Sequence, residues 1–427
     1  MKNTKQVSWD KLDNTALLFP VIASESMSSV WRISCVLTEP VDRACLQAAQ
    51  EKVLKSFSVF RMRLRTGLFW YYFEENRRPY PPVVEEHDYP GSYINRSKNN
   101  QYLFRLTYYD CRINLEVFHA LTDGFGGVVF IKEIIYQYLR LRYPEALAGE
   151  ADKLSSDIFL DYEDSYIKNY RKTGGDKKRY KNSQAVTLHG EHLPDGAVGL
   201  IEGIMPLAEL KRVAHEKGVS LNTLLVGVYC YAIYREYLGG RASDEPVACA
   251  VPVNLRPYYE SHTMKNFFAI VTAEFLPDRE GITLDEVLQI VSDSLKGQIT
   301  KENLDEIITY NVSNERNLIV RLVPLVIKRL AVRQVYEASS HACTTTVTNI
   351  GRVELREPYR PYVRNISCLI SMSSGQNMKA AVVAYEDRLT ITFTSVLAGT
   401  SVQGRFFQTL TGLGVHAAVH TNGVYEE

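Results

Sequence analysis

Residues 112–130, RINLEVFHALTDGFGGVVF, constrain the fold most, because a strand pattern gives way to a helix pattern inside them. Every second residue from Ile113 to Val117 is apolar, which is the period of a strand with one buried face. His119 continues this apolar row. After the turn at 122–124, apolar residues recur at helical spacing from Val128 onward. The run therefore predicts a strand, a turn and a helix, with a histidine where the strand ends.

The residues of this turn indicate proton-transfer chemistry. A neutral imidazole with one free ring nitrogen can take a proton from a hydroxyl, amine or thiol near neutral pH, so His119 is a candidate general base. Asp123 is predicted either to cap the following helix or to pair with an arginine that locks the turn. Gly124 permits a positive φ or a close backbone approach. On the motif alone, a chance occurrence in an ordinary strand–turn–helix unit stays open.

The segment HALTDG (119–124) resembles the His-x-x-x-Asp-Gly signature of the acyltransferase superfamily that includes chloramphenicol acetyltransferase. Plant BAHD acyltransferases, wax ester synthases and peptide-synthetase condensation domains are further members. The flanking sequence looks most like the bacterial alcohol acetyltransferase-like proteins. The resemblance extends over most of the chain and depends on the order and spacing of five stretches: LDNTALLFP (12–20), FRMRLRTGLFWYYFEEN (60–76), HALTDGFGG (119–127), VPVNLRPYY (251–259) and TNIGRVEL (348–355).

The resemblance implies an α/β fold of two chloramphenicol acetyltransferase-like sheet-and-helix lobes with a tunnel between them. It implies direct acyl transfer without an acyl-enzyme. His119 would deprotonate a small-molecule alcohol or amine, which attacks the thioester of an acyl-CoA co-substrate. No cofactor would be bound. Two alternatives stay open: a condensation-type enzyme that takes its acyl group from an acyl carrier protein, and a non-catalytic binding member of the fold.

The resemblance also implies supporting residues around the base. In this superfamily an arginine commonly pairs with the aspartate of the motif, and Arg256 is the first candidate for that partner of Asp123. Arg32 and Arg61 are the alternatives. Arg256 could also be an ordinary exposed arginine before a proline turn, with no role in the motif. We expect His119 to lie midway along the tunnel, which would open at two ends.

Hydroxyl and amide side chains of a later strand are candidates for the oxyanion site. Thr346, Thr348 and Asn349 lie in CTTTVTNIG, which resembles the Ser-Asn-x-x-Gly segment of wax ester synthases. Donors there would stabilise a tetrahedral oxyanion and form the tunnel wall opposite the base. Alternating threonines are also ordinary strand residues. His341, close by, is interpreted as structural.

Three departures from the family patterns favour a stand-alone enzyme. Phe118 stands where peptide-synthetase condensation domains typically carry a first histidine. The Asp-Phe-Gly-Trp-Gly motif of the plant enzymes is absent, and we expect no fused carrier-protein domain. The acceptor therefore stays open.

Composition excludes several other classes. Lys+Arg and Asp+Glu are balanced at 49 each, so net charge does not predict a nucleic-acid partner. The 7 cysteines show no Cys-x-x-Cys spacing, which argues against a zinc site and a disulfide framework. His189 and His192 are three residues apart without a third ligand, so a surface loop is preferred to a metal site. No apolar leader or transmembrane segment is visible, and we expect a cytoplasmic protein.

The chain is predicted to divide near residue 180. Residues 1–180 would form the N-terminal lobe, with a crossover from about 145, and 181–427 the C-terminal lobe. Strands are expected at 15–23, 27–37, 101–109, 112–119, 197–205, 246–253, 343–349, 365–373, 379–386 and 389–396, with a hairpin at 60–75. Helices are expected at 41–56, from about 127 to 144, at 207–218, after Ser220, within 283–338 and at 402–419.

One predicted helix has two interpretations. The segment from 317 to 336, NLIVRLVPLVIKRLAVRQVY, is amphipathic, with arginines among leucines and valines. A packed helix with solvated arginines is preferred to a helix lying on a membrane surface.

Overall fold

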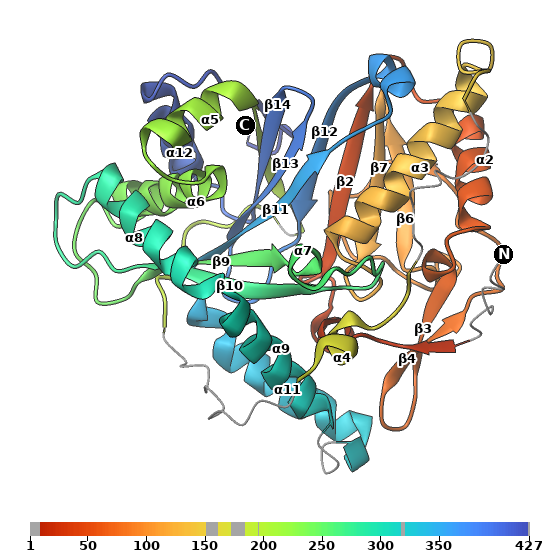
Figure 1. Ribbon diagram of the computed structural model, residues 1–427, viewed down its shortest axis with the longest axis horizontal. Helices are drawn as coiled ribbons and strands as arrows, with labels where there is room; N and C mark the ends of the chain where they lie inside the picture. Colours follow the sequence, from red (N-terminus) through yellow and green to blue (C-terminus); the bar gives the residue numbers. More distant parts are fainter. Residues whose placement is uncertain (1–8, 151–160, 172–183, 195, 317–320, 426–427) are drawn as a thin grey trace.

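The computed structural model describes residues 9–150, 161–171, 184–194, 196–316 and 321–425. The chain forms two lobes side by side, each built on its own β-sheet (Figure 1). The predicted α/β fold with two sheet-and-helix lobes is confirmed.

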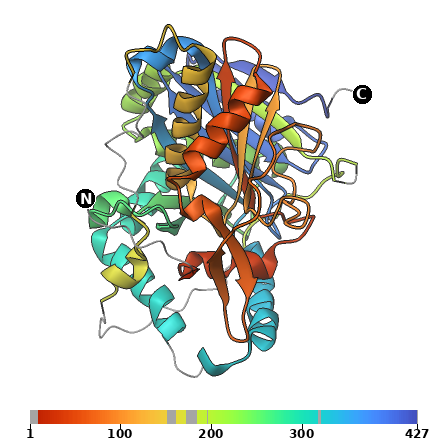
Figure 2. The same cartoon turned by 90° about the vertical axis from the view of Figure 1, so that its right-hand side faces the viewer.

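The first lobe is a five-stranded sheet in the order β12-β2-β7-β6-β5. Figure 2 shows two long helices lying against one face of it. Its last strand in the chain, β12, comes from the C-terminal third and pairs antiparallel with β2. These elements are β2 (Val30–Leu37), α2 (Arg43–Leu54), β5 (Val84–Glu85), β6 (Phe104–Tyr109), β7 (Arg112–Phe118), α3 (Gly124–Arg142) and β12 (Val363–Ile370).

The second lobe is a seven-stranded sheet in the order β10-β9-β11-β13-β14-β8-β15. Its strands are β8 (Gly199–Pro206), β9 (Val247–Asn254), β10 (Phe268–Phe275), β11 (Thr345–Val353), β13 (Met378–Tyr385), β14 (Arg388–Ser395) and β15 (Ala418–Thr421). The helices α5 (Leu207–Glu216), α6 (Leu221–Ala232), α8 (Leu284–Gln298) and α12 (Ser401–Gly412) lie on its outer side in Figure 1. The helix predicted after Ser220 is α6, and Ser220 caps it by accepting a hydrogen bond from the Thr223 amide.

Smaller elements join and flank the lobes. The strands β1 (Trp9–Lys11), β4 and β3 form a three-stranded sheet. The remaining elements are α1 (Phe19–Ile22), β3 (Met62–Thr66), β4 (Tyr71–Glu75), α4 (Ser165–Asn169), α7 (Arg256–Tyr259), α9 (Lys301–Arg316) and α11 (Leu325–Ser339). The predicted hairpin at 60–75 is β3 and β4, closed where the Gly67 amide donates to the Trp70 carbonyl (2.9 Å).

Alternation along β11 and β13 turns one face of the second sheet toward the first lobe. Val347 and Ala380 belong to the core of the second lobe. Ala381 belongs to the core of the first lobe, and Ile350 packs against it. Because successive side chains of a strand point to opposite faces, Thr346, Thr348 and Lys379 share the face that looks toward the first lobe.

Two element predictions are wrong. Residues 15–23 form a 3₁₀ turn and the short helix α1, not a strand. Asp13 accepts a hydrogen bond from the Ala16 amide (2.8 Å), and Pro20 lies in the first turn of α1, where a missing N–H costs nothing. The predicted helix 402–419 ends at Gly412, because Gly414 adopts φ +79° and the chain then enters β15.

The amphipathic helix α11 packs along one edge only. Leu325 and Lys328 are buried, and Lys328 Nζ lies over the Trp70 ring. Val326 is 71% exposed and Leu330 63%, so the packed interpretation holds only for the edge of the helix that contains Leu325 and Lys328. Among the described residues, no helix is long and apolar enough to cross a membrane.

The predicted lobe boundary near residue 180 falls outside the described residues and stays a prediction. Of the crossover from 145 onward, the described part contains α4 and the segment 184–194.

Candidate active site

His119 follows the last residue of β7, at the junction of the lobes. Its backbone amide still donates to the Ser29 carbonyl (2.9 Å), so the strand pairing holds its backbone in place. The half-buried imidazole stacks on Phe19 (4.5 Å between centroids, 14° between planes), with Trp31 edge-on at 6.3 Å. Phe268, at the start of β10, lies 5.7 Å away. Aromatic rings from both lobes therefore fix the plane of the imidazole.

One hydrogen bond decides which ring nitrogen is basic. His119 Nδ1 lies 3.1 Å from Asn266 Oδ1. Asn266 Nδ2 donates to Asp13 Oδ2 (3.0 Å), which fixes the amide with its oxygen toward the imidazole. Because an amide oxygen only accepts, Nδ1 carries the proton and Nε2 is the basic nitrogen of the neutral ring.

The surroundings keep the imidazole neutral. Burial lowers the pKa of His119, and the positive charge of Lys379 lowers this pKa further. Asp123 and the hydrogen bond with Asn266 act in the opposite direction on this pKa, without reversing the shift. A lowered pKa means that His119 is in its proton-accepting form at neutral pH.

Asp123 has a different environment. Its carboxylate is 6% exposed and contacts neither ring nitrogen of His119. Oδ1 accepts from the amides of Phe125 (3.1 Å) and Gly126 (3.3 Å), which caps α3. Oδ2 accepts from the Phe267 amide of the second lobe (2.9 Å). Both structural roles foreseen for Asp123 are therefore present, because it caps the helix and also binds an arginine.

That arginine is Arg256, not Arg32 or Arg61. Arg256 Nη1 donates to Asp123 Oδ2 (2.8 Å) and Nη2 donates to Oδ1 (3.1 Å), a bidentate pair. Arg256 is 5% exposed, so the ion pair is buried. Arg32 instead binds Glu86 and Glu116 on the first sheet.

A loop of the second lobe, residues 263–267, holds both ends of the motif. The Thr263 and Lys265 carbonyls accept from Arg256 (2.9 and 2.7 Å from Nη2), and the Met264 carbonyl accepts from the Thr122 hydroxyl (2.6 Å). The next two residues are Asn266, bound to His119, and Phe267, bound to Asp123. This loop and Asp13 are the functional residues that sequence reasoning missed. Asp13 lies in LDNTALLFP, but nothing local marks it.

The motif's glycines differ in how much space they have. Gly124 is the first residue of α3 and does not use the positive φ that a glycine permits. A Cβ added at Gly124 would lie 3.5 Å from Ile350, which is ordinary contact. A Cβ at Gly127 would lie 1.9 Å from the Trp31 ring. The close approach is therefore made at Gly127.

The three oxyanion candidates share the strand β11. Thr346 Oγ1 donates to Gln376 Oε1 (2.7 Å). Thr348 is half-buried two residues on. Asn349 is exposed at a bulge, where its Oδ1 accepts from the Gly351 amide (2.8 Å). Their role and the tunnel stay predictions.

A buried lysine stands next to these threonines. Lys379 is 5% exposed and donates a hydrogen bond to the Ser373 hydroxyl. Burial lowers the pKa of Lys379 to about 7. The register that pairs Val347 with Ala380 places Lys379 beside Thr346 on the face toward the first lobe.

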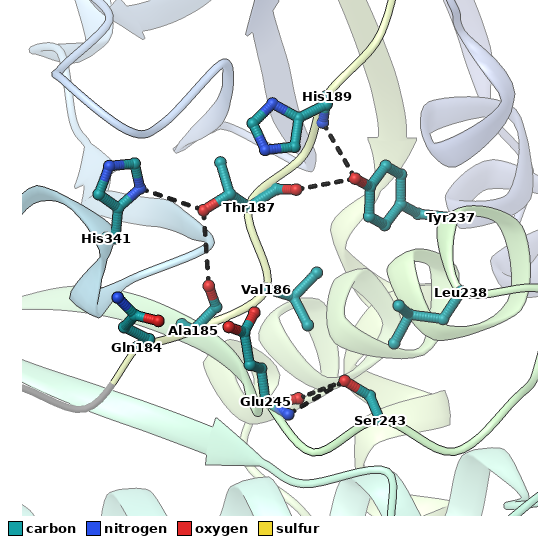
Figure 3. A pocket seen from close by; sticks show the side chains of 10 residues that line it. All are labelled: Gln184, Ala185, Val186, Thr187, His189, Tyr237, Leu238, Ser243, Glu245 and His341. Atoms are coloured by element: carbon teal, nitrogen blue, oxygen red, sulfur yellow. Dashed lines mark hydrogen bonds between the residues drawn. The ribbon is translucent and has the colours of Figure 1, made fainter.

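The remaining histidines lie elsewhere. Figure 3 shows His189 and His341 at a separate pocket of about 460 Å³, where the His341 ring faces Thr187 (3.3 Å). His192 belongs to the same surface segment, in an isolated bridge with Leu397. Within the described ranges, no three His, Cys, Asp or Glu side chains are grouped to hold a metal ion. All seven cysteines are free thiols.

By sequence, no family model and no curated protein matches the chain. Several solved structures share its fold. Polyketide synthase associated protein 5 from Mycobacterium tuberculosis aligns with a TM-score of 0.60 and 13% identity, over 94% of this chain and 96% of that one. The first condensation domain of the calcium-dependent antibiotic synthetase, in complex with a substrate analogue, aligns at 0.65 and 16%, over 95% and 96%.

A third similar structure was solved with two ligands. It is a mutant of the starter condensation domain of rhizomide synthetase in complex with C8-CoA and Leu-SNAC, with a TM-score of 0.61, 13% identity, and coverage of 95% and 94%. The chain therefore has the fold of condensation domains and of polyketide synthase associated protein 5. The finer resemblance to alcohol acetyltransferase-like proteins stays a prediction.

Proposed function

We propose that this protein is an acyltransferase that moves an acyl group from a thioester, acyl-CoA in the first instance, to an alcohol or amine. His119 is the general base and no acyl-enzyme forms. The single observation that carries the proposal is the environment of the imidazole. Asn266 holds Nδ1, burial keeps the ring neutral, and Nε2 is the basic nitrogen.

The reaction needs one proton to move twice. Nε2 of His119 takes the proton of the acceptor hydroxyl or amine as the acceptor oxygen or nitrogen bonds to the thioester carbonyl carbon. The carbon–sulfur bond of the tetrahedral intermediate then breaks, and His119 returns the proton to the departing thiolate. General-base catalysis typically contributes about 10²–10⁴-fold, and orientation of the two substrates must contribute most of the rest.

Donors for the oxyanion would come from β11. Thr346, Thr348 and Asn349 are our candidates. Thr348 has the strongest support because it faces the first lobe and, among the described residues, its hydroxyl has no hydrogen-bond partner, whereas the single O–H of Thr346 already donates to Gln376. A hydroxyl that is not engaged elsewhere can donate when the oxyanion forms. Asp123, Gly124 and Arg256 would support the motif without touching substrate.

The donor has two candidate sources. The structure of a similar condensation domain contains C8-CoA, which supports a CoA thioester. The match to synthetase condensation domains supports a thioester on an acyl carrier protein. The same base serves both, since the reacting group is a pantetheine thioester in either case. A non-catalytic binding role is the remaining alternative.

Transfer can be tested by following thiol release from acetyl-, octanoyl- and palmitoyl-CoA, and from an acyl carrier protein loaded with the same chains. Each donor is offered with a panel of alcohols and amines. We expect acceptor-dependent thiol release and no acyl adduct on the protein by intact mass. Release that is independent of any acceptor, or a stable acyl-enzyme, contradicts the proposal.

A further inference from the structure

A pocket separate from that in Figure 3 lies next to the residues that surround the candidate base. Its volume is about 240 Å³, and it lies between β3, β4, the loop before β6 and α11. Phe118, the residue before His119, lines it. Pro20 also lines it, and the neighbouring residue Phe19 stacks on the His119 ring. The pocket therefore adjoins the strand end that carries the imidazole.

The lining of the pocket has an apolar part, which we call the floor, and a polar part. Leu64, Ile94, Leu103 and Phe118 line it and are at most 8% exposed. Its polar side chains are Thr66, Tyr71, Tyr93, Arg96 and Arg329. Within the described part of the chain, none of these five side chains has a hydrogen-bond or ion-pair partner.

The two arginines line the same pocket as Tyr71. Burial raises the pKa of Tyr71, and the positive charges of Arg329 and Arg96 partly offset that increase in pKa. No carboxylate lines the described pocket. Arg105 of the first lobe, by contrast, is paired with the acids Glu116 and Asp88. Two guanidinium groups without an acid form a site for an anion that the protein itself does not supply.

We propose that this pocket binds the acceptor substrate through a carboxylate or phosphate group, with an apolar part of the same molecule on the floor. Guanidinium groups bind either anion in a bidentate manner, and the three hydroxyls can donate to its remaining oxygens. Pockets for whole drug-sized ligands measure about 300–1,000 Å³, so this one takes one end of its ligand. The other end would extend past Phe118 toward His119.

The acceptor fits this position better than the donor. In CoA the long pantetheine arm separates the thioester from the nearest phosphate. An anion bound in this pocket, beside the strand end that carries His119, therefore belongs to a short molecule whose nucleophile is near its charged group. Hydroxy acids, amino acids and phosphate esters with an apolar portion have this form. The acceptor assignment rests on the proposed function, whereas anion binding by the pocket does not.

Binding is tested first, without catalysis. Isothermal titration of the full chain with octyl phosphate, octanoate and octanol separates the charge from the apolar tail. We expect octyl phosphate to bind the wild type and His119→Ala equally. Arg96→Gln and Arg329→Gln should each weaken it by about tenfold or more, as expected for a hydrogen bond to a charged group. Arg333→Gln, an exposed arginine one turn further along α11, is the matched control and should change nothing.

Kinetics then identify the reactant that carries the anion. We expect Arg96→Gln and Arg329→Gln to raise KM for anionic acceptors equally with acyl-CoA and with the phosphate-free acyl-N-acetylcysteamine, and to leave KM for neutral acceptors unchanged. A rise confined to acyl-CoA would assign the anion to the donor and overturn the acceptor assignment. Equal binding of octanol and octyl phosphate, or full binding by both variants, would overturn the anion site. A chain that binds octyl phosphate but transfers no acyl group would instead refute the proposed function.

Discussion

His119 and Asp123 are four residues apart in one motif, and their surroundings differ in kind. Both carboxylate oxygens of Asp123 are bound by backbone amides and by Arg256. The imidazole of His119 is held at Nδ1 and by stacked rings, and Nε2 is its basic nitrogen. A side chain whose polar atoms are all bound by the protein stabilises structure. A rigid side chain with one basic atom to spare is suited to take a proton.

Replacing the base should have the largest effect. His119→Ala should lower kcat by about 10²–10⁴-fold, the usual contribution of general-base catalysis. The melting temperature should stay nearly unchanged, because the half-buried ring has one hydrogen bond and can be replaced by water. Turnover and thermal unfolding are measured on the same preparation. More than a tenth of wild-type turnover with the right substrates would exclude His119 as the base.

Asp123→Asn should affect stability as well as rate. Removing one partner of a buried ion pair costs on the order of 3–5 kcal/mol, because Arg256 is left uncompensated. Urea unfolding measures this cost. Asp123→Asn/Arg256→Met should lose less than the two single variants together, which isolates the coupling. Full stability with a large loss of kcat would instead make Asp123 part of the proton-transfer machinery.

Asn266→Ala should show how much the orientation of the His119 ring contributes to the rate. Without the Oδ1 acceptor, the Nδ1 proton is no longer held and part of the imidazole population has the wrong tautomer. Removing groups that orient a reactive side chain commonly costs about 10–100-fold. We expect this loss in kcat with KM unchanged. An equal increase in KM would show that Asn266 contacts substrate.

The pH dependence of the rate should follow the lowered pKa of His119. Burial disfavours the imidazolium form, so the basic form persists below the ordinary histidine pKa of about 6.5. In kcat/KM the acid limb should therefore fall below that pH. Lys379→Met removes a nearby positive charge and should move the limb to higher pH. An acid limb above pH 7, or one that Lys379→Met leaves in place, would mean that another group is titrating.

The smallest effects should come from the motif's own glycine. Gly124→Ala places its Cβ in ordinary contact with Ile350 and should change the free energy of unfolding by less than about 1 kcal/mol. Gly127→Ala meets the Trp31 ring and should cost about 1–3 kcal/mol. Chemical denaturation of both variants measures the difference. A larger cost at Gly124 would show that the motif needs glycine for a reason other than space.

Local patterns were enough to predict much of the fold. Strand alternation and the helix after it placed His119 at a strand end, and β7 and α3 confirm those elements. The segment 15–23 was wrongly predicted to be a strand, because its apolar residues pack as helical turns around Pro20. The resemblance to acyltransferases supplied Arg256, which no pattern in residues 251–259 identifies as the partner of Asp123.

The sequence by itself determined the strand, turn and helix that carry His119 and its motif, since these elements depend on neighbours within a few turns of chain. The two-lobe α/β class came from the resemblance to acyltransferases. Only the tertiary structure decided the tautomer of His119, because Asp13 and Asn266 lie far from it in sequence and meet it through the 263–267 loop. The same holds for the pocket of Arg96 and Arg329, whose charges come from separate elements. Spacing along a chain predicts local geometry, but electrostatics at a site depend on distances through space that only packing sets.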